Sequence, residues 1–248
     1  MVAEKKGGDL KAFYWVLGAT ALIAGGALAW SSLGGGLGSM ATGPITSIVM
    51  GELEDIEALV EMATGVERGD PDAPITILEF ADFQCPACQQ FASMVKPQID
   101  LAYVDEGIVR FVFHDFPLSG HPHAFLAARA ARCALDQGEQ YFWPYHDQLF
   151  RNQATWSLSS VSPTNAFESY AGSLGLDENN FADCLDSDRH ADVISANMRL
   201  GIELGVSATP TVFVSEGAGR SIRVSRWNEF EAYQSVIERM MEDAGDGN

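Results

Sequence analysis

The sequence is poor in positive charge. Its 248 residues include 15 Lys or Arg and 34 Asp or Glu, which gives a formal net charge of −19. After residue 30 there are 12 basic and 32 acidic residues, and Lys96 is the one lysine in that part. Proteins that bind nucleic acid or an anionic membrane surface present clusters of Lys and Arg, so this composition argues against both partners. It predicts instead a solvated acidic surface that keeps the protein soluble.

Cysteine is scarce as well, and the arrangement of its four residues argues against a zinc centre. A structural zinc site usually uses two close ligand pairs, but Cys133 and Cys184 have no close partner at zinc-site spacing. The His121-Pro122-His123 segment is too short and rigid to form such a site alone. We therefore expect no metal and no tightly bound cofactor, and we interpret all five histidines as ordinary loop or helix residues: His114, His121, His123, His146 and His190.

Charged residues are absent from 12–30, which carry aromatic residues near both ends. A helix of this length spans roughly 28 Å, about the thickness of a bilayer core. Lysines in 1–11 mark that side as cytoplasmic, which predicts a single-pass anchor with the remaining chain outside the cytoplasm. The alternative is a cleavable signal peptide, because Ala27-Leu28-Ala29 has the small-x-small form of a cleavage site. A cleaved chain would be secreted.

Residues 31–65 form the expected linker. Glycine and serine dominate 31–43, which is typical of a flexible tether. Apolar residues at helical spacing predict a short amphipathic helix over 52–62.

The most informative motif is Cys85-Pro86-Ala87-Cys88, which follows an apolar run at 75–81. This run predicts a strand, and the residues after the motif predict a helix over 86–103 that is interrupted or kinked at Pro97. A cysteine at the start of a helix faces unpaired N–H groups and the positive end of the helix dipole, which stabilise a thiolate. Two cysteines at this spacing between a strand and a helix indicate a redox-active pair.

The remaining pattern predicts an α/β domain over 66–243 with a tail at 244–248. We expect a second strand at 108–114, and paired strands at 211–215 and 221–225 followed by a helix at 227–242. Between them lies a mostly helical block over about 115–205, with helices at 123–137, 141–152 and 164–174 and one or two more over 179–204. This order predicts a thioredoxin-type core with an inserted helical subdomain. The aromatic residues of the block form either helix-packing core or part of a substrate groove: Tyr141, Phe142, Trp143, Tyr145 and Phe150.

Three separated segments together resemble the DsbA-like thiol–disulfide oxidoreductases. They are EFADFQCPACQQF, FPLSGHPHAFLAARAARCALDQGEQYFWPYHDQLF and GVSATPTVFV, in the order that the family shows. The resemblance covers roughly residues 66–243 and implies a thioredoxin fold with a helical lid. It also implies that Cys85 attacks substrates and that Cys88 resolves the mixed disulfide.

Further site residues follow from the resemblance. Pro210 would form a cis peptide bond opposite the cysteines, so that the Thr209 backbone could pair with an extended substrate. Glu79 matches a buried acid of the family that exchanges a proton with the second cysteine, although a strand carboxylate turned to solvent is an equal alternative. Pro86 and Ala87 would tune the redox potential. Some relatives have histidine between the cysteines, and its absence here predicts a milder oxidant.

Cys133 and Cys184 lie in different expected helices. An extracytoplasmic setting favours a structural disulfide between them. Two free buried thiols or a second redox pair are the alternatives.

These observations predict a membrane-anchored oxidoreductase that acts on cysteines of secreted or envelope proteins, and they favour the role of an oxidase. Its own reoxidation would require a membrane redox partner, either a quinone-linked oxidase or a thiol reductant if electrons flow the other way. The alternatives are a reductase or isomerase that uses the same cysteines, and a redox-inactive, membrane-tethered binding or chaperone module.

Overall fold

The computed structural model describes residues 56–216 and 220–245. The expected anchor at 12–30, the tether at 31–43 and the end of the tail lie outside these residues. Within the described ranges, no helix combines the length and the apolar character that crossing a membrane requires. The expected helix at 52–62 is described from Ile56 onward, as α2 (Ile56–Met62).

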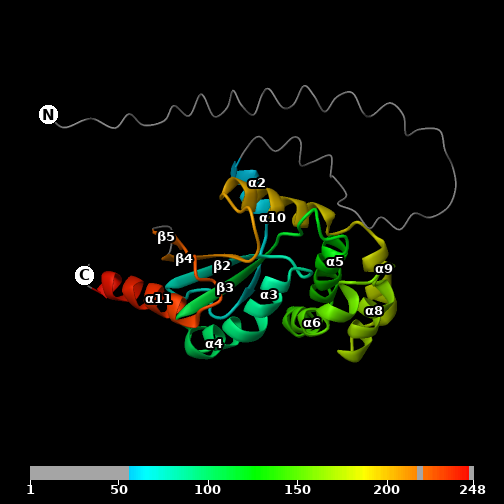
Figure 1. Ribbon diagram of the computed structural model, residues 1–248, viewed down its shortest axis with the longest axis horizontal. Helices are drawn as coiled ribbons and strands as arrows, with labels where there is room; N and C mark the ends of the chain where they lie inside the picture. Colours follow the sequence, from blue (N-terminus) through cyan, green and yellow to red (C-terminus); the bar gives the residue numbers. More distant parts are fainter. Residues whose placement is uncertain (1–55, 217–219, 246–248) are drawn as a thin grey trace, which may run out of the picture. The chain divides into compact units, whose positions relative to one another are not determined.

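A five-stranded mixed sheet forms the centre of the domain, in the order β1-β3-β2-β4-β5 (Figure 1). The central strand β2 pairs in parallel with β3 and antiparallel with β4. The edge strands β1 and β5 are antiparallel to β3 and β4. The strand bounds are β1 (Val66–Arg68), β2 (Ile75–Ala81), β3 (Val109–Asp115), β4 (Thr211–Glu216) and β5 (Ser221–Arg223).

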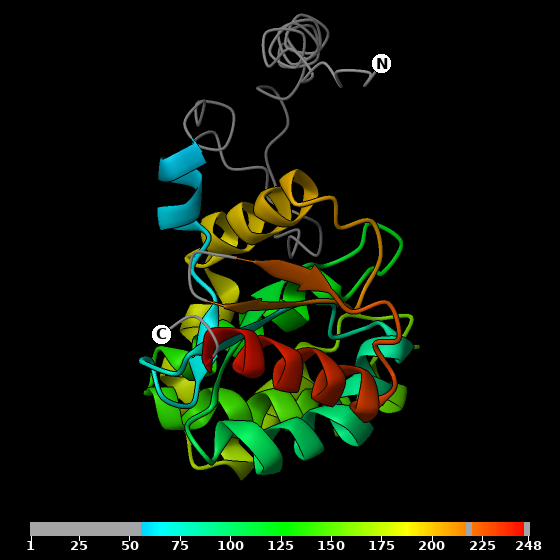
Figure 2. The same ribbon diagram turned by 90° about the vertical axis from the view of Figure 1, so that its left-hand side faces the viewer.

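Both faces of the sheet are covered by helices, which explains why β2 is apolar on both sides (Figure 2). One face packs against α3, α4 and α11, and the opposite face against α10, on which α2 lies. Alternation along β2 therefore places Ile77 and Glu79 on one face and Phe80 on the other. The helices named here are α3 (Pro86–Gln90), α4 (Lys96–Ile99), α10 (Ala191–Glu203) and α11 (Phe230–Gly245).

The helix that follows the cysteine motif runs on through two π-helical turns, Phe91–Val95 and Asp100–Val104. In the first turn, the Lys96 N–H donates to the Phe91 carbonyl, five residues back. Pro97 follows directly, and it lacks an N–H and crowds the carbonyl four residues before it. The wider turn makes room for this ring, so the helix continues past Pro97 with a locally changed hydrogen-bond pattern.

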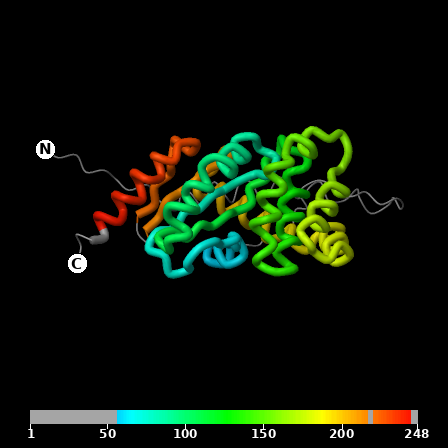
Figure 3. The backbone as a smooth tube through the Cα atoms, turned by 90° about the horizontal axis from the view of Figure 1, so that it is seen from below, coloured from blue at the N-terminus to red at the C-terminus, as the bar shows by residue number. Residues whose placement is uncertain are grey.

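Five helices between β3 and α10 form the helical subdomain (Figure 3). They are α5 (Ala124–Leu135), α6 (Glu139–Arg151), α7 (Gln153–Trp156), α8 (Thr164–Ser173) and α9 (Glu178–Asp186). Phe142, Tyr145 and Phe150 are buried in the core, whereas Tyr141 and Trp143 are partly buried against it. The predicted helical segment at 179–204 is two helices, because the chain leaves the helix at Ser187 before α10 begins.

A disulfide between Cys133 of α5 and Cys184 of α9 links two helices of this subdomain, with 5.8 Å between the Cα atoms. Both residues are buried. The bond closes a separation of 51 residues. Chain-entropy arithmetic for a loop of that length gives about 4 kcal/mol, an upper value because the unfolded chain keeps some structure.

Polar side chains connect the subdomain to the segment that precedes the sheet. Arg132 of α5 donates to the Thr64 carbonyl at 2.8 Å and to the Asp115 carboxylate at 2.8 Å. Asn197 of α10 donates to the same Thr64 carbonyl at 3.2 Å. The backbone ahead of β1 is therefore bonded to two helices.

The differences from expectation include one additional strand and a later start of the last helix. The strand β1 was not expected, because only Val66 of its three residues is buried and the segment is too short to show alternation. The final helix begins at Phe230 and not at 227, because residues 227 and 228 form a turn.

Replacing both cysteines of the disulfide, as Cys133→Ala/Cys184→Ala, is expected to lower the free energy of unfolding by up to about 4 kcal/mol. Urea denaturation measures the loss, in a Cys85→Ser/Cys88→Ser background that prevents disulfide exchange. The background alone is the control. An unchanged unfolding midpoint would show that the bond does not stabilise the fold.

Candidate active site

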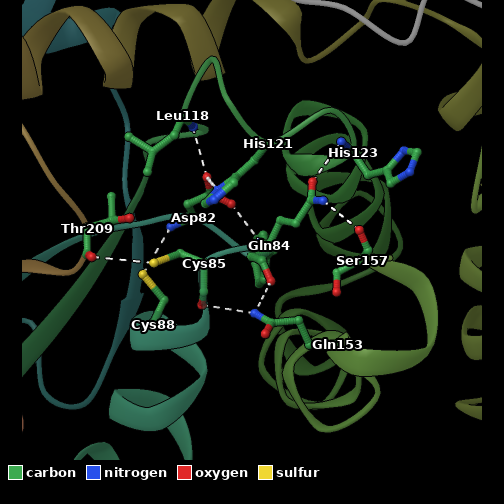
Figure 4. A network of polar contacts seen from close by, with 11 residues as sticks. Asp82, Gln84, Cys85, Cys88, Leu118, His121, His123, Gln153, Ser157 and Thr209 are labelled. Carbon is green, nitrogen blue, oxygen red and sulfur yellow. Dashed lines mark hydrogen bonds and ion pairs between the residues drawn. The ribbon is translucent and has the colours of Figure 1, made fainter. Parts of the chain in front are cut away.

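Cys85 and Cys88 lie side by side where β2 passes into α3 (Figure 4). Both are free thiols in this structure. Cys85 is the residue before the first helical position, with an extended backbone, and its carbonyl accepts from the Gln89 N–H at 3.1 Å. Pro86 occupies the first turn of the helix, where its missing N–H costs no helical hydrogen bond. The motif therefore starts the helix and presents the Cys85 sulfur to its open N–H groups.

The surroundings of Cys85 favour its thiolate. Its pKa falls from 9.0 to about 5, chiefly through the hydrogen bond with the Cys88 side chain. Burial opposes this shift, and the Thr209 side chain and the backbone N–H groups of Cys88 and Ala87 support it. A thiol with such a pKa is ionised at neutral pH, reactive as a nucleophile and effective as a leaving group.

Cys88 has the opposite environment. It is fully buried, and burial raises its pKa well above 9.0. The neighbouring charges of Cys85 and Glu79 raise it further, while the Asp82 N–H, 3.4 Å from its sulfur, acts against the shift. At neutral pH, Cys85 is therefore a thiolate and Cys88 a protonated thiol, which gives the two residues different reactivity.

The loop before β4 lies opposite Cys85. Its Thr209–Pro210 peptide bond is cis. The Cys85 sulfur lies 3.4 Å from the Thr209 carbonyl oxygen, to which the thiol donates when it is protonated, and both loop residues are buried. The structure therefore brings the expected residues Cys85 and Cys88 together with Thr209 and Pro210, although the two pairs are more than a hundred residues apart in the sequence.

Glu79 lies on the face of β2 that is covered by the cysteine helix, and it is completely buried. Neither of its carboxylate oxygens has a hydrogen-bond partner in the part of the chain that the structure describes. Burial raises its pKa from 4.5 to about 8, with Lys96 opposing the shift and Asp100 supporting it. The alternative of a solvent-facing carboxylate is wrong for this residue.

Four polar residues of the site were not expected from the sequence: Asp82, Gln84, His121 and Gln153. The Gln153 amide donates to the carbonyls of Phe83 and Cys85 at 2.7 and 2.9 Å. The Gln84 amide donates to the Ser157 carbonyl and accepts from the His123 N–H, both at 2.7 Å. Asp82 and Gln84 lie inside the segment EFADFQCPACQQF, and their position next to the cysteines was a signal that could have identified them. Nothing in the sequence connects Gln153 to the cysteines.

A second group of possible ligands lies in the helical subdomain. Among the described residues, atoms of Cys133, Cys184 and His190 lie within 4.8 Å of one another. Both sulfurs are bonded in the disulfide, and His190 pairs with Asp136 at 3.0 Å. A disulfide sulfur is not a thiolate ligand, so the group in this state has no metal-binding chemistry.

The pKa of Cys85 gives a direct expectation for the reduced protein. The thiolate absorbance of Cys85 should titrate with a midpoint near pH 5, and alkylation of Cys85 should slow below that pH. Because the folded pKa lies below the unfolded one, the contribution of Cys85 to stability is lost as pH falls through about 5. As pH rises from 5 to 8, the unfolding free energy of the reduced protein should therefore increase relative to that of the oxidised protein, as measured by urea unfolding. A midpoint near 8.5 would contradict the assigned environment.

Comparison with known proteins agrees with this geometry. A family profile described as thioredoxin matches residues 61–239, most of the chain. Disulfide bond formation protein D of Bacillus subtilis is 26% identical over 171 residues, which cover 69% of this chain and 74% of that protein. The crystal structure of oxidised BdbD from Bacillus subtilis superposes with a TM-score of 0.64 and 26% identity, covering 72% of this chain and 93% of that one.

A different relative matches through only a part of its length. The Na(+)/H(+) antiporter NhaA 3 of Salinispora tropica is 37% identical over 149 residues, which cover 60% of this chain and 21% of the antiporter. The chain thus spans about a fifth of the length of that relative. Taken with the site, the profile and the Bacillus proteins assign the family. The chain belongs to the thioredoxin family and, within it, to the DsbA-like thiol–disulfide oxidoreductases.

Proposed function

We propose that the chain exchanges disulfides with cysteines of secreted or envelope proteins through Cys85 and Cys88, and that it acts as an oxidase. The observation that carries the proposal is the contrast between the two sulfurs. Cys85 has a pKa of about 5 at the helix start, and Cys88 is buried with a raised pKa. A stabilised Cys85 thiolate favours the reduced form of the pair, which makes the disulfide form oxidising.

The proposed cycle begins from the Cys85–Cys88 disulfide. A substrate thiolate attacks the Cys85 sulfur, a substrate–Cys85 bond forms, and Cys88 leaves and takes up a proton. A second substrate thiolate then attacks the substrate sulfur of this mixed disulfide, and Cys85 leaves as its thiolate. The substrate has lost two electrons and gained a disulfide, and the enzyme has gained both electrons.

Two further residues have assigned roles in this cycle. Glu79 is mostly protonated at neutral pH, since its pKa is about 8, and exchanges a proton with Cys88 in either direction. The Thr209 backbone, next to cis Pro210 and facing Cys85, pairs with the extended substrate chain. Pro86 and Ala87 tune the couple through the helix start, because the Ala87 N–H is among the groups that stabilise the thiolate.

The location and the partner of the enzyme belong to the same proposal. The uncharged segment at 12–30 anchors the chain in the membrane, with the redox domain on the extracytoplasmic side. The domain occupies 66–243, and the helices of 115–205 form its lid. A quinone-linked membrane partner reoxidises Cys85 and Cys88.

Oxidation of a reduced dithiol peptide by the purified, oxidised protein tests the function. Wild type should oxidise the peptide, and Cys85→Ser should abolish turnover because the attacked sulfur is gone. Cys133→Ser/Cys184→Ser, assayed below its unfolding temperature, is the matched control and should retain turnover. A binding module would keep its peptide affinity in Cys85→Ser and show no turnover in either form.

The glutathione equilibrium of the same couple tests the direction of electron flow. We expect a potential more negative than about −120 mV, the strongly oxidising limit of the family, and less negative than the −270 mV or so of a reductant such as thioredoxin. A value at the reductant end would favour the reductase alternative over the oxidase.

Glu79→Gln should separate the role of Glu79 in proton transfer from its effect on stability. The variant should slow release of the mixed disulfide by attack of Cys88, the reverse of the first step, in stopped-flow measurements, because Cys88 loses its proton partner. It should also stabilise the fold, since the folded pKa of Glu79 lies above the unfolded value. In the wild type, the loss of folding free energy caused by the raised pKa of Glu79 is absent below pH 4.5. It grows as pH rises toward 8 and is roughly 3 kcal/mol at pH 7. Unchanged release kinetics with increased stability would remove Glu79 from the mechanism.

A further inference from the structure

The disulfide of the helical subdomain lies within a cluster of metal-ligand side chains. The cluster brings together the ends of three helices, with Cys133 and Asp136 at the end of α5, Cys184 near the end of α9 and His190 just before α10. α5 packs against both of the other helices (Figure 1). Among the described residues, ligand atoms of Cys133, Cys184 and His190 lie within 4.8 Å of one another. Side chains from three helices therefore converge on one point.

Asp136 adds a carboxylate at a distance that suits a fourth ligand. Its Oδ2 lies 3.0 Å from His190 Nε2 and 3.7 Å from the Cys184 sulfur. Around a tetrahedral zinc ion with bonds of ordinary length, a nitrogen and an oxygen ligand are about 3.4 Å apart. A sulfur and an oxygen ligand are about 3.6 Å apart. The three side chains are therefore already close to the separations that zinc requires.

Reduction turns the two sulfurs into metal ligands. A dithiol supplies two electrons and forms its own disulfide, and the bond between Cys133 and Cys184 breaks to give two thiols. A divalent metal ion then displaces one proton from each thiol. Two sulfurs on a tetrahedral zinc ion are about 3.8 Å apart. The Cα atoms, 5.8 Å apart, leave room for this separation by rotation of the side chains alone.

The charges of the reduced cluster suit a divalent cation. Two thiolates and the Asp136 carboxylate carry three negative charges, and Arg189, 2.9 Å from that carboxylate, supplies one positive charge. A divalent ion makes this group neutral. Cys133 and Asp136 also line a cavity of about 460 Å³, to which Asp183 contributes a further carboxylate. The Asp136 side chain is 33% exposed, so an ion can reach the cluster from solvent.

We propose that reduction of the disulfide converts this cluster into a Zn²⁺ site whose ligands are Cys133, Cys184, His190 and Asp136. Thiolate and imidazole ligands favour Zn²⁺ over Mg²⁺ or Ca²⁺, which prefer oxygen ligands. The ion joins α5, α9 and the start of α10, so the reduced subdomain is held by a metal in place of the covalent bond. The inference is independent of the proposed function, since neither Cys85 nor Cys88 takes part.

Cobalt binding to the reduced full chain tests the inference. A Cys85→Ser/Cys88→Ser variant leaves Cys133 and Cys184 as its only cysteines. After reduction with dithiothreitol and anaerobic removal of the reductant, Co²⁺ should give the visible bands of tetrahedral cobalt and near-ultraviolet sulfur-to-metal charge-transfer bands, at one ion per chain. Zn²⁺ added afterwards should displace Co²⁺ and remove the bands. The oxidised form of the same variant should show neither set of bands.

Substitutions in the same variant identify the other two ligands. His190→Gln and Asp136→Asn should each weaken Zn²⁺ binding at least about tenfold, because even the loss of an outer-sphere partner of a metal site costs that much. His121→Gln is the matched control. His121 forms a similar pair with Asp82 in a different part of the fold, so its replacement should leave the Zn²⁺ affinity unchanged.

Urea unfolding of the reduced variant gives a readout that needs no cobalt. Zn²⁺ binds the assembled cluster more tightly than the separated ligands of the unfolded chain, so it should raise the unfolding midpoint of the reduced form and leave the oxidised form unchanged. Absence of the charge-transfer bands, an unchanged affinity in His190→Gln, or a reduced chain that Zn²⁺ does not stabilise would overturn the inference. Each of these outcomes leaves disulfide exchange at Cys85 and Cys88 intact.

Discussion

The arrangement of the site depends on one junction, where the buried strand β2 ends and a helix begins at Cys85. The strand is fixed by neighbours on both sides and by helices on both faces, so its end has a defined position. The helix that begins there directs free N–H groups toward the first sulfur. Since β4 pairs with β2, the cis-proline loop before β4 is brought to the same edge of the sheet as Cys85.

The two sulfurs differ because this junction has an outer and an inner side. Cys85 lies at the outer side, among donors that favour its charge, and Cys88 lies one helical turn inward, where burial disfavours any charge. Glu79 occupies the same interior with no hydrogen-bond partner among the described residues, which raises its pKa for the same reason. An unpartnered buried carboxyl lowers stability, and its retention fits a proton-exchange role better than a structural one.

The sequence carries some of these features better than others. The long buried strands and amphipathic helices are predictable because their apolar periodicity is strong, and the cysteine motif marks the junction by itself. The three-residue strand β1 and the π-helical turn before Pro97 leave no periodic signal, since they arise from edge pairing and from local crowding. The hydrogen bonds from Gln153 to Cys85 and from His121 to Asp82 also leave no signal in the sequence. They depend on how the helical subdomain packs over the sheet.

The bonds at the Thr64 carbonyl have a mechanical consequence. Arg132 of α5 and Asn197 of α10 both donate hydrogen bonds to this carbonyl, and Arg132 also donates to the buried Asp115 carboxylate. Tension applied to the chain ahead of Ile56 would meet these side chains before it reached the sheet. The load would pass into α5 and α10 and, through Asp115, into the end of β3, so β2, the strand that ends at the reactive sulfur, would not be the first to carry it.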